Sequence, residues 1–273
     1  VFLLAILQGY GVYIFPFEFT KTASFNTIGT STALGVYAVF IVTLASGLLL
    51  SSHRENVTKT GRSIAAMVVN VVTALMGLFV IMVIDFWPVT TALVIASLLL
   101  MVAAFYHAKT LRGIGCIAIP VLGFIMGVIL FFVASPVRLG YSPEIMPSMR
   151  SSWNITVQTL RQRSLLGSGP ATFLYDYAKY KSTDVNRTGF WDVRFDRSSS
   201  RFFTLLATTG LLGAILWGLL VIYMFAMSLR RLLKSDEQTW HSLIGIFVAW
   251  TVVLLSRFLY SSVMTLEFIF WIS

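Results

Sequence analysis

The sequence predicts an all-α polytopic membrane protein, and three observations predict it. Of the 273 residues, 57% are apolar and only 11% are charged, against roughly 25% in an ordinary soluble domain. Apolar runs of about 20 residues, the length of a helix that spans a bilayer, recur along the chain. They leave a single long hydrophilic segment, residues 135–200. This composition excludes a soluble globular enzyme, a disordered chain and a disulfide-rich scaffold.

Six apolar runs are predicted to span the membrane. They are residues 31–50, 64–84, 89–106, 117–134, 202–228 and 242–255, the last extended by Phe258 and Leu259. Two further runs, 1–17 and 263–272, are interpreted as parts of other spans. Because the chain starts at Val1 and stops inside an apolar run, we expect it to be a segment of a longer polypeptide. The first run lacks the basic region and cleavage site of a signal peptide.

Lysine and arginine set the predicted orientation. Loops 51–63, 107–115 and 230–241 hold eight of these residues, while the short loops opposite hold only Lys21. The three basic loops are therefore expected in the cytoplasm and segment 135–200 outside, since loops beyond about 60 residues cross largely regardless of charge. Three parts are predicted: membrane helices in 1–134 (about five spans), an extracytoplasmic loop in 135–200, and membrane helices in 201–273. The eight residues are Arg54, Lys59, Arg62, Lys109, Arg112, Arg230, Arg231 and Lys234.

The net charge of +9 would suggest nucleic acid in a soluble protein. Here the basic residues lie between apolar runs, so the expected partners are membrane phospholipid and an anionic lipid-linked substrate, and no nucleic acid. The single cysteine, Cys116, forms no internal disulfide and is expected to be a small buried apolar residue.

Segment 135–200 is expected to be ordered, since it is rich in aromatic residues. Ser148 is a plausible N-cap for a helix lying on the membrane surface. The Gly-x-Gly-Pro run at 167–170 ends that helix, 172–180 can form another, and 182–200 is irregular. Two neighbouring stripes are predicted on the first helix: an apolar one of Met149, Trp153, Val157 and Leu160, and a polar one of Arg150, Asn154, Gln158 and Arg161.

Eight arginines but only two lysines lie in and beside this segment. Arg150 and Arg161 fit either a solvated face that meets headgroup phosphates or a diphosphate clamp, because a guanidinium offers phosphate a planar fork of donors. The arginine bias favours the clamp modestly. The eight are Arg138, Arg150, Arg161, Arg163, Arg187, Arg194, Arg197 and Arg201.

Two carboxylates, Asp192 and Asp196, lie four residues apart. A metal pair is conceivable, but ion pairs with Arg194 and Arg197 are the favoured interpretation, and no metal or cofactor is predicted. The segment contains no histidine, which excludes a Ser-His-Asp or Cys-His nucleophile there. Walker A, Gly-x-Gly-x-x-Gly and His-Glu-x-x-His motifs are also missing from the sequence.

Three short motifs lie in order around this segment. A glycine-containing run at 24–30 precedes a predicted membrane helix, Arg150-Ser151-Ser152-Trp153 is followed by Ser164-Leu165-Leu166-Gly167-Ser168-Gly169-Pro170, and residues 199–213 lead into another predicted membrane helix. Together these motifs resemble the O-antigen ligase and O-antigen polymerase superfamily of bacterial membrane enzymes. The second motif is similar to the family's Arg…Trp…Pro-Leu-Leu-Gly-x-Gly run, and the third to its re-entry into the membrane. The resemblance covers the last half of the chain well, and the first half only by its helix pattern.

This resemblance implies a bundle related to the C-type glycosyltransferases, with one large extracytoplasmic loop. It implies an enzyme at the outer face of the bacterial cytoplasmic membrane that transfers or polymerises glycan from an undecaprenyl-diphosphate-linked donor, as in lipopolysaccharide and other cell-envelope polysaccharide biosynthesis. The acceptor would be a glycan, a lipid or a protein, and neither metal nor nucleotide sugar would be needed. Arg150 would hold the diphosphate, with Arg161, Arg163 and Arg201 in support.

One departure concerns the proton acceptor. Many family members carry a His-Asn pair just before the re-entry helix, whereas this chain has Ser199-Ser200. Asp196 or Asp192 would then accept the proton, or acceptor activation differs, or the chain is a non-catalytic relative. Two other functions stay open: a transporter or flippase of a lipid-linked glycan, and a non-enzymatic membrane protein that binds cell-wall glycan.

Overall fold

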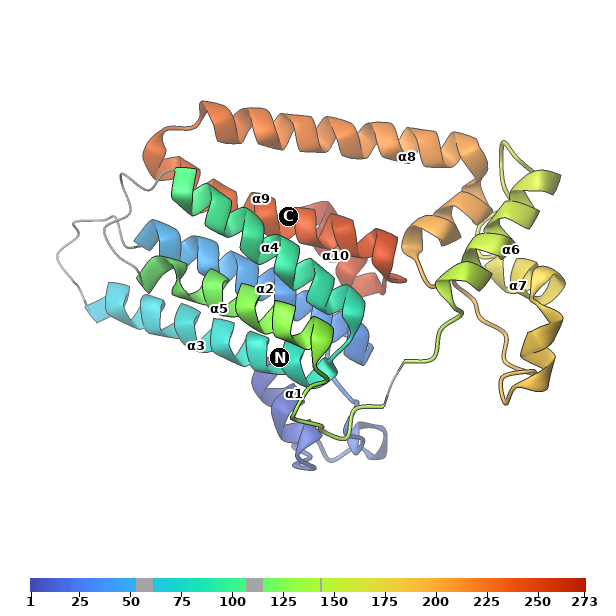
Figure 1. The fold of residues 1–273 in the computed structure, drawn as a ribbon, viewed down its shortest axis with the longest axis horizontal. Coiled ribbons are helices and arrows are strands. Elements are labelled where there is room, and N and C mark those ends of the chain that lie inside the picture. Colours follow the sequence, from blue (N-terminus) through green and yellow to red (C-terminus); the bar gives the residue numbers. More distant parts are fainter. Residues whose placement is uncertain (53–60, 107–114, 143) are drawn as a thin grey trace. The chain divides into compact units, whose positions relative to one another are not determined.

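The computed structural model describes residues 1–52, 61–106, 115–142 and 144–273. Every regular element in those ranges is helical (Figure 1), as the sequence predicts for an all-α membrane protein. Five of the described helices are long and apolar enough to cross a membrane. The longer helices are α2 (Ser31–Ser52), α3 (Gly61–Ile84), α4 (Trp87–Tyr106), α5 (Gly115–Phe132), α6 (Met149–Gln162), α8 (Arg201–Lys234) and α9 (Glu237–Leu259). The shorter ones are α1 (Phe2–Gly9), α7 (Phe173–Tyr180) and α10 (Met264–Ile272), with 3-10 turns η1 (Glu18–Thr20) and η3 (Thr183–Arg187).

Most predicted spans coincide with helices. α2, α3, α4, α8 and α9 have the length and hydropathy of spans, whereas the apolar described stretch of α5, Ile117–Phe132, is shorter. The predicted run 1–17 is helical only as far as Gly9. α4 begins with Trp87-Pro88, and a proline in the first helical turn needs no backbone hydrogen bond. The basic residues Arg54, Lys59, Lys109 and Arg112 lie outside the described residues, so the orientation stays a prediction.

The chain forms two compact units. The larger unit contains residues 1–144, 229–256 and 263–273, and the smaller unit contains residues 145–228 and 257–262. In the larger unit, Gly47 and Gly245 let α2 and α9 approach closely, since a Cβ atom on Gly245 would lie 2.8 Å from the Cα of Gly47. The smaller unit contains α6, α7 and most of α8, so it combines most of the predicted external segment with the span predicted over 202–228.

α8 is bent sharply at Gly210. This residue has φ 69° and ψ −170°, a combination almost confined to glycine, and it divides α8 into a short arm (201–209) and a long arm (211–234). Figure 1 shows the short arm turning back from the long one, and the rings of Phe202 and Trp217 meet at 6.2 Å between centroids. The long arm has about 24 residues, or about 36 Å, which is enough to cross a bilayer. The span predicted over 202–228 is therefore two helical arms.

The turn at residues 164–169 fills the bend with backbone hydrogen bonds. The amides of Ser168 and Gly169 donate to the carbonyls of Ala207 (3.0 Å) and Thr208 (2.9 Å). In return, the amides of Leu211 and Leu212 donate to the carbonyls of Ser164 (2.9 Å) and Leu165 (3.1 Å). A break in a helix leaves polar groups without their helical partners, and these four bonds satisfy them. The Gly-x-Gly turn and the bend of α8 therefore form one structural element.

Candidate functional site

α6 is the predicted surface helix, and it starts where the sequence indicates. Ser148 is its N-cap, and the Ser148 Oγ accepts a hydrogen bond from the Ser151 amide at 3.1 Å. The predicted polar stripe is exposed along its length, and Trp153 of the apolar stripe is exposed as well. A third face is buried in the protein instead. It consists of Ser152, Ile155, Thr156 and Thr159, which are all buried.

Residues 198–201 are hydrogen-bonded to α6 on one side and to the end of α9 and the residue after it on the other. The Ser199 amide and its hydroxyl both lie 3.0 Å from the Ser152 Oγ. On the other side, the Ser200 Oγ donates to the Arg257 carbonyl at 3.0 Å, and the Arg201 amide donates to the Tyr260 carbonyl at 3.0 Å. This double attachment fixes the backbone at the start of α8, and with it the position from which the Arg201 side chain extends.

A small apolar core joins α6, α7 and the short arm of α8. Ile155 of α6, Phe173 and Tyr177 of α7, and Ala207 of α8 are all buried and pack together. Phe173 is fully buried and still borders the cavity described below, so the core and the cavity share one side chain.

A buried carboxylate holds the turn that leads into α7. Asp176 is buried, and its Oδ2 accepts a short hydrogen bond from the Ser168 Oγ. The Thr172 Oγ1 lies 2.6 Å from both the Ser168 Oγ and the Gly169 carbonyl. Burial raises the pKa of Asp176, while the Ser168 hydrogen bond and the charges of Lys179 and Arg163 act in the opposite direction. Asp176 therefore ties the Gly-x-Gly turn to α7.

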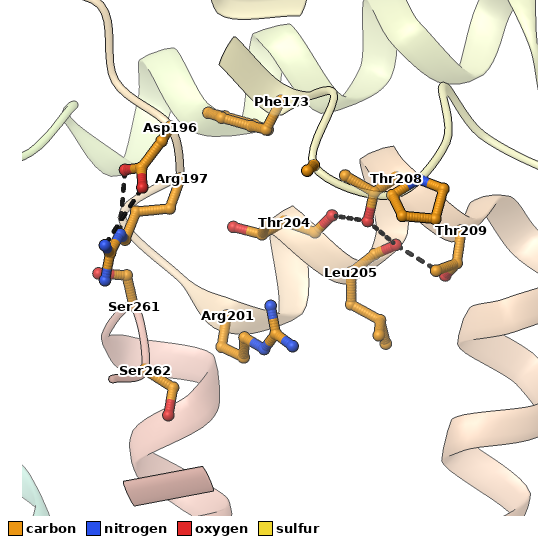
Figure 2. A pocket seen from close by; sticks show the side chains of 12 residues that line it. Phe173, Asp196, Arg197, Arg201, Thr204, Leu205, Thr208, Thr209, Ser261 and Ser262 are labelled. Carbon is orange, nitrogen blue, oxygen red and sulfur yellow. Dashed lines mark hydrogen bonds and ion pairs between the residues drawn. The ribbon is translucent and has the colours of Figure 1, made fainter. Parts of the chain in front are cut away.

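A pocket of about 380 Å³ opens between these elements of the smaller unit (Figure 2). The turn before α7 forms one wall, the short arm of α8 another, and the residues after α9 a third. The lining residues are Pro170, Ala171, Phe173, Asp196, Arg197, Arg201, Thr204, Leu205, Thr208, Thr209, Ser261 and Ser262.

Charge in the pocket comes from Arg201 and from the pair of Asp196 and Arg197. The Arg197 Nε and Nη2 donate to the two Asp196 carboxylate oxygens at 3.1 and 3.2 Å. Hydrogen bonding from Arg197 holds the pKa of Asp196 below its ordinary value, against a smaller opposing effect of desolvation. With two guanidinium groups and one carboxylate, the lining carries a net positive charge. Such a lining suits an anionic ligand.

The threonines of the short arm present hydroxyl oxygens. The Thr208 Oγ1 donates to the Thr204 carbonyl at 2.7 Å, and the Thr209 Oγ1 donates to the Leu205 carbonyl at 2.8 Å (Figure 2). Because their protons are directed to the helix backbone, these hydroxyls offer lone pairs to a ligand. The pocket therefore combines cationic groups with hydrogen-bond acceptors, which matches a ligand that carries both phosphate and hydroxyl groups.

Two of the six predicted site residues, Asp196 and Arg201, lie on this pocket. Asp192, Arg150, Arg161 and Arg163 are exposed and are not among its lining residues. Of these, Arg163 reaches the Ser168 carbonyl with its Nη1 at 3.5 Å. The ion pair favoured for Asp196 is present with Arg197.

Other pocket residues carry no clear signal in the sequence. Arg197 is one of the eight arginines of the segment and a predicted partner of Asp196, and no sequence pattern points to Ser261 or Ser262. The threonines at 208 and 209 have one signal, since they stand directly before the glycine of the re-entry motif. Arg257, near the end of α9, does not line the pocket. It is 4% exposed, and its guanidinium carbon lies 6.0 Å from the centre of the Trp217 ring.

No protein-family model matches the sequence, and no curated protein matches it. Among the residues that the structure describes, no group of three His, Cys, Asp or Glu side chains is arranged to hold a metal ion.

Proposed function

We propose that the pocket of the smaller unit binds the diphosphate of a lipid-linked glycan, and that the protein transfers or polymerises this glycan at the outer face of a bacterial cytoplasmic membrane. The observation that supports the proposal is the presence of Arg197, Arg201 and Asp196 on one pocket beside a helix of membrane-spanning character. One guanidinium group can donate two parallel hydrogen bonds to two phosphate oxygens. Such charged hydrogen bonds are among the strongest that proteins make. A pocket of about 380 Å³ is within the range of small-ligand sites and suits a diphosphate with its first sugar.

Arg201 has the main role in this proposal. Its backbone is held between α6 and the residues after α9, so its guanidinium can bind the diphosphate from a fixed position. The resemblance gave this role to Arg150, but Arg150 is exposed in the first turn of α6 and does not line the pocket. We assign Arg150, Arg161 and Arg163 to the surrounding surface, where they meet headgroup phosphates.

Transfer requires an acceptor hydroxyl to attack the anomeric carbon of the glycan. The new glycosidic bond forms as the bond between that carbon and the diphosphate oxygen breaks, and the lipid diphosphate leaves with its electron pair. The hydroxyl proton passes to Asp196, which takes the place of the missing histidine. Its low pKa keeps Asp196 ionised at neutral pH and makes it a weak base, so charge stabilisation of the leaving diphosphate by the arginines is the larger contribution.

A second function is favoured by one observation. Asp196 is bound through both carboxylate oxygens to Arg197, an arrangement that opposes proton transfer. The smaller unit would then hold the same kind of ligand without turning it over, as in a membrane protein that binds cell-wall glycan. Binding is common to both functions, and only turnover separates them.

The test uses the purified full chain in lipid nanodiscs, with an undecaprenyl-diphosphate-linked oligosaccharide as donor and a second glycan as acceptor. Arg201→Ala is expected to weaken donor binding roughly 10- to 100-fold, as for the loss of a charged hydrogen bond, and to abolish transfer. Arg150→Ala, the matched control on the exposed face of α6, should reduce donor affinity and glycan transfer much less. Donor binding that survives Arg201→Ala unchanged would contradict the proposed site. Donor binding by the unaltered protein without transfer would support the binding function instead.

A further inference from the structure

Four leucines at the bend of α8 are exposed although backbone hydrogen bonds connect the two segments that carry them. Leu165 and Leu166, on the non-helical turn, are 66% and 71% exposed, and Leu211 and Leu212, at the start of the long arm, are 43% and 49% exposed. We call these four residues the leucine patch.

Hydrogen bonds of the backbone keep the members of the patch together. The Leu212 amide donates to the Leu165 carbonyl, and the Leu211 amide donates to the carbonyl of Ser164, the residue before Leu165. Gly167 and Gly210 allow the turn to approach the bend closely, because neither has a side chain. A Cβ atom on Gly167 would lie 2.6 Å from the Gly210 nitrogen. The patch is therefore one fixed surface.

Leucine side chains of this exposure are unfavourable in water but favourable in hydrocarbon. The long arm of α8, which is long enough to span a bilayer, begins at Leu211, so its first turn belongs at the edge of the hydrocarbon layer. The non-helical turn can lie at the same depth because its amides and carbonyls are bonded to the bend. Both halves of the patch are thus compatible with contact to a hydrocarbon chain.

The pocket and the leucine patch are connected through the backbone of the bend. Thr208 and Thr209 line the pocket and directly precede Gly210, and the Gly169 amide, from the turn that carries Leu165 and Leu166, donates to the Thr208 carbonyl. A cationic pocket whose lining residues directly neighbour apolar residues along the chain fits an amphiphile with a phosphate head and a long chain. A water-soluble sugar phosphate has no hydrocarbon chain that could contact the leucines.

We propose that the leucine patch holds the hydrocarbon chain of the same lipid whose diphosphate occupies the pocket. This inference rests on the proposed function, because it takes the pocket as the site of the diphosphate. It adds that the protein recognises the chain as well as the head, so that affinity depends on chain length.

The experiment compares two probes on the detergent-solubilised full chain: undecaprenyl diphosphate, which has a long chain, and inorganic pyrophosphate, which has none. The double variant Leu165→Gln with Leu166→Gln is expected to bind undecaprenyl diphosphate at least roughly tenfold more weakly, from the loss of two apolar contacts, and pyrophosphate equally well. Leu165→Phe with Leu166→Phe keeps the surface apolar and should retain most of the affinity for the lipid. Ile145→Gln, which changes an exposed apolar residue of the same unit outside the patch, is the matched control.

Unchanged affinity of the glutamine variant for undecaprenyl diphosphate would overturn the proposal. A parallel loss of both probes would also overturn it, because the leucines would then support the pocket and not the chain. Failure of the proposed function has a different result: the unaltered protein would bind neither probe, or Arg201→Ala would leave both affinities unchanged.

Discussion

Gly167 and Gly210 meet backbone to backbone, so closely that a Cβ atom placed on Gly210 would lie 2.5 Å from the Gly167 nitrogen. Both residues have positive φ, +66° and +69°. The turn before α7 and the bend of α8 therefore depend on each other, and the bend directs the short arm with Arg201, Thr204 and Thr208 toward the pocket.

Replacement of Gly210 by alanine is the first test of this contact. We expect Gly210→Ala to lower the free energy of unfolding by at least about 2 kcal/mol, because a side chain at this φ is strained and its Cβ clashes with the turn. Thermal unfolding of the detergent-solubilised protein measures the effect. Gly218→Ala is the control, since a Cβ there meets nothing within 4 Å and alanine favours a helix. Equal stability of the two variants would show that the contact is not needed.

The second prediction concerns the attachment of residues 198–201 to α6. Ser152 is fully buried, and its Oγ is the acceptor for the Ser199 amide. Ser152→Ala removes that acceptor, and an amide left without a partner costs about 1–3 kcal/mol of stability. Because the attachment of residues 198–201 fixes the backbone of Arg201, the affinity for pyrophosphate should fall as well. Ser151→Ala changes a neighbouring, less buried serine and should alter neither quantity. A Ser152→Ala protein that unfolds like the unaltered one would contradict this role.

The helices were accessible to prediction because bilayer thickness imposes a simple rule on sequence. Runs of about 20 apolar residues at 31–50, 64–84 and 89–106 correspond to α2, α3 and α4. The bend in α8 was not predicted, since Gly210 lies in an apolar run, and glycine inside a membrane helix is ordinary. Its partner Gly167 stands 43 residues earlier. Only their contact in space shows that the helix breaks.

The pocket could be predicted from the sequence only in part. The abundance of arginine in one segment suggested an anionic ligand site, which stays a hypothesis, and two of the residues named for it, Asp196 and Arg201, lie on one pocket. Periodicity drew attention to Arg150 because it lies on a regular polar stripe of α6. Arg197 and the residues after α9 lie in irregular segments, where spacing along the chain says nothing about proximity. Their position depends on the hydroxyl network of Ser152, Ser199 and Ser200, which small polar residues do not reveal in a sequence.

Phe173 gives a third prediction, because it belongs to both the core and the pocket wall. Phe173→Ala removes a fully buried ring that packs with Ile155, Tyr177 and Ala207, and such truncations cost about 3–5 kcal/mol. Phe173→Leu keeps most of the volume and should cost much less. Unfolding by denaturant compares the two. If the alanine variant lost less stability than the leucine variant, the ring would not be part of the core.

Asp176 gives a prediction about pH. Its pKa is raised above the ordinary value of 3.8, so between 3.8 and the raised value the folded protein binds more protons than the unfolded chain. The free energy of unfolding should therefore fall as pH rises through that window and level off above it. Asp176→Asn keeps an acceptor for the Ser168 hydroxyl and should flatten this part of the curve. Unfolding at a series of pH values measures the slope, with exposed Asp192→Asn as the control. A slope that persists in Asp176→Asn would assign the proton to another group.

Asp196→Asn separates binding from turnover. The pair with Arg197 is largely exposed, so its loss should change stability by less than about 1 kcal/mol. Removing the carboxylate also removes a negative charge from the pocket lining, and that charge repels an anionic ligand. Pyrophosphate binding to the full chain should therefore become tighter.

Glycan transfer should become slower in the same variant, because an amide cannot accept the proton of the acceptor hydroxyl. Asp192→Asn, on the exposed chain four residues earlier, should leave both binding and transfer unchanged. Tighter binding with full transfer would remove Asp196 from the mechanism while leaving the pocket as the anion site. Weaker binding would mean that Asp196 positions Arg197 for the diphosphate, because the loss of the ion pair would then matter more than the loss of the repelling charge.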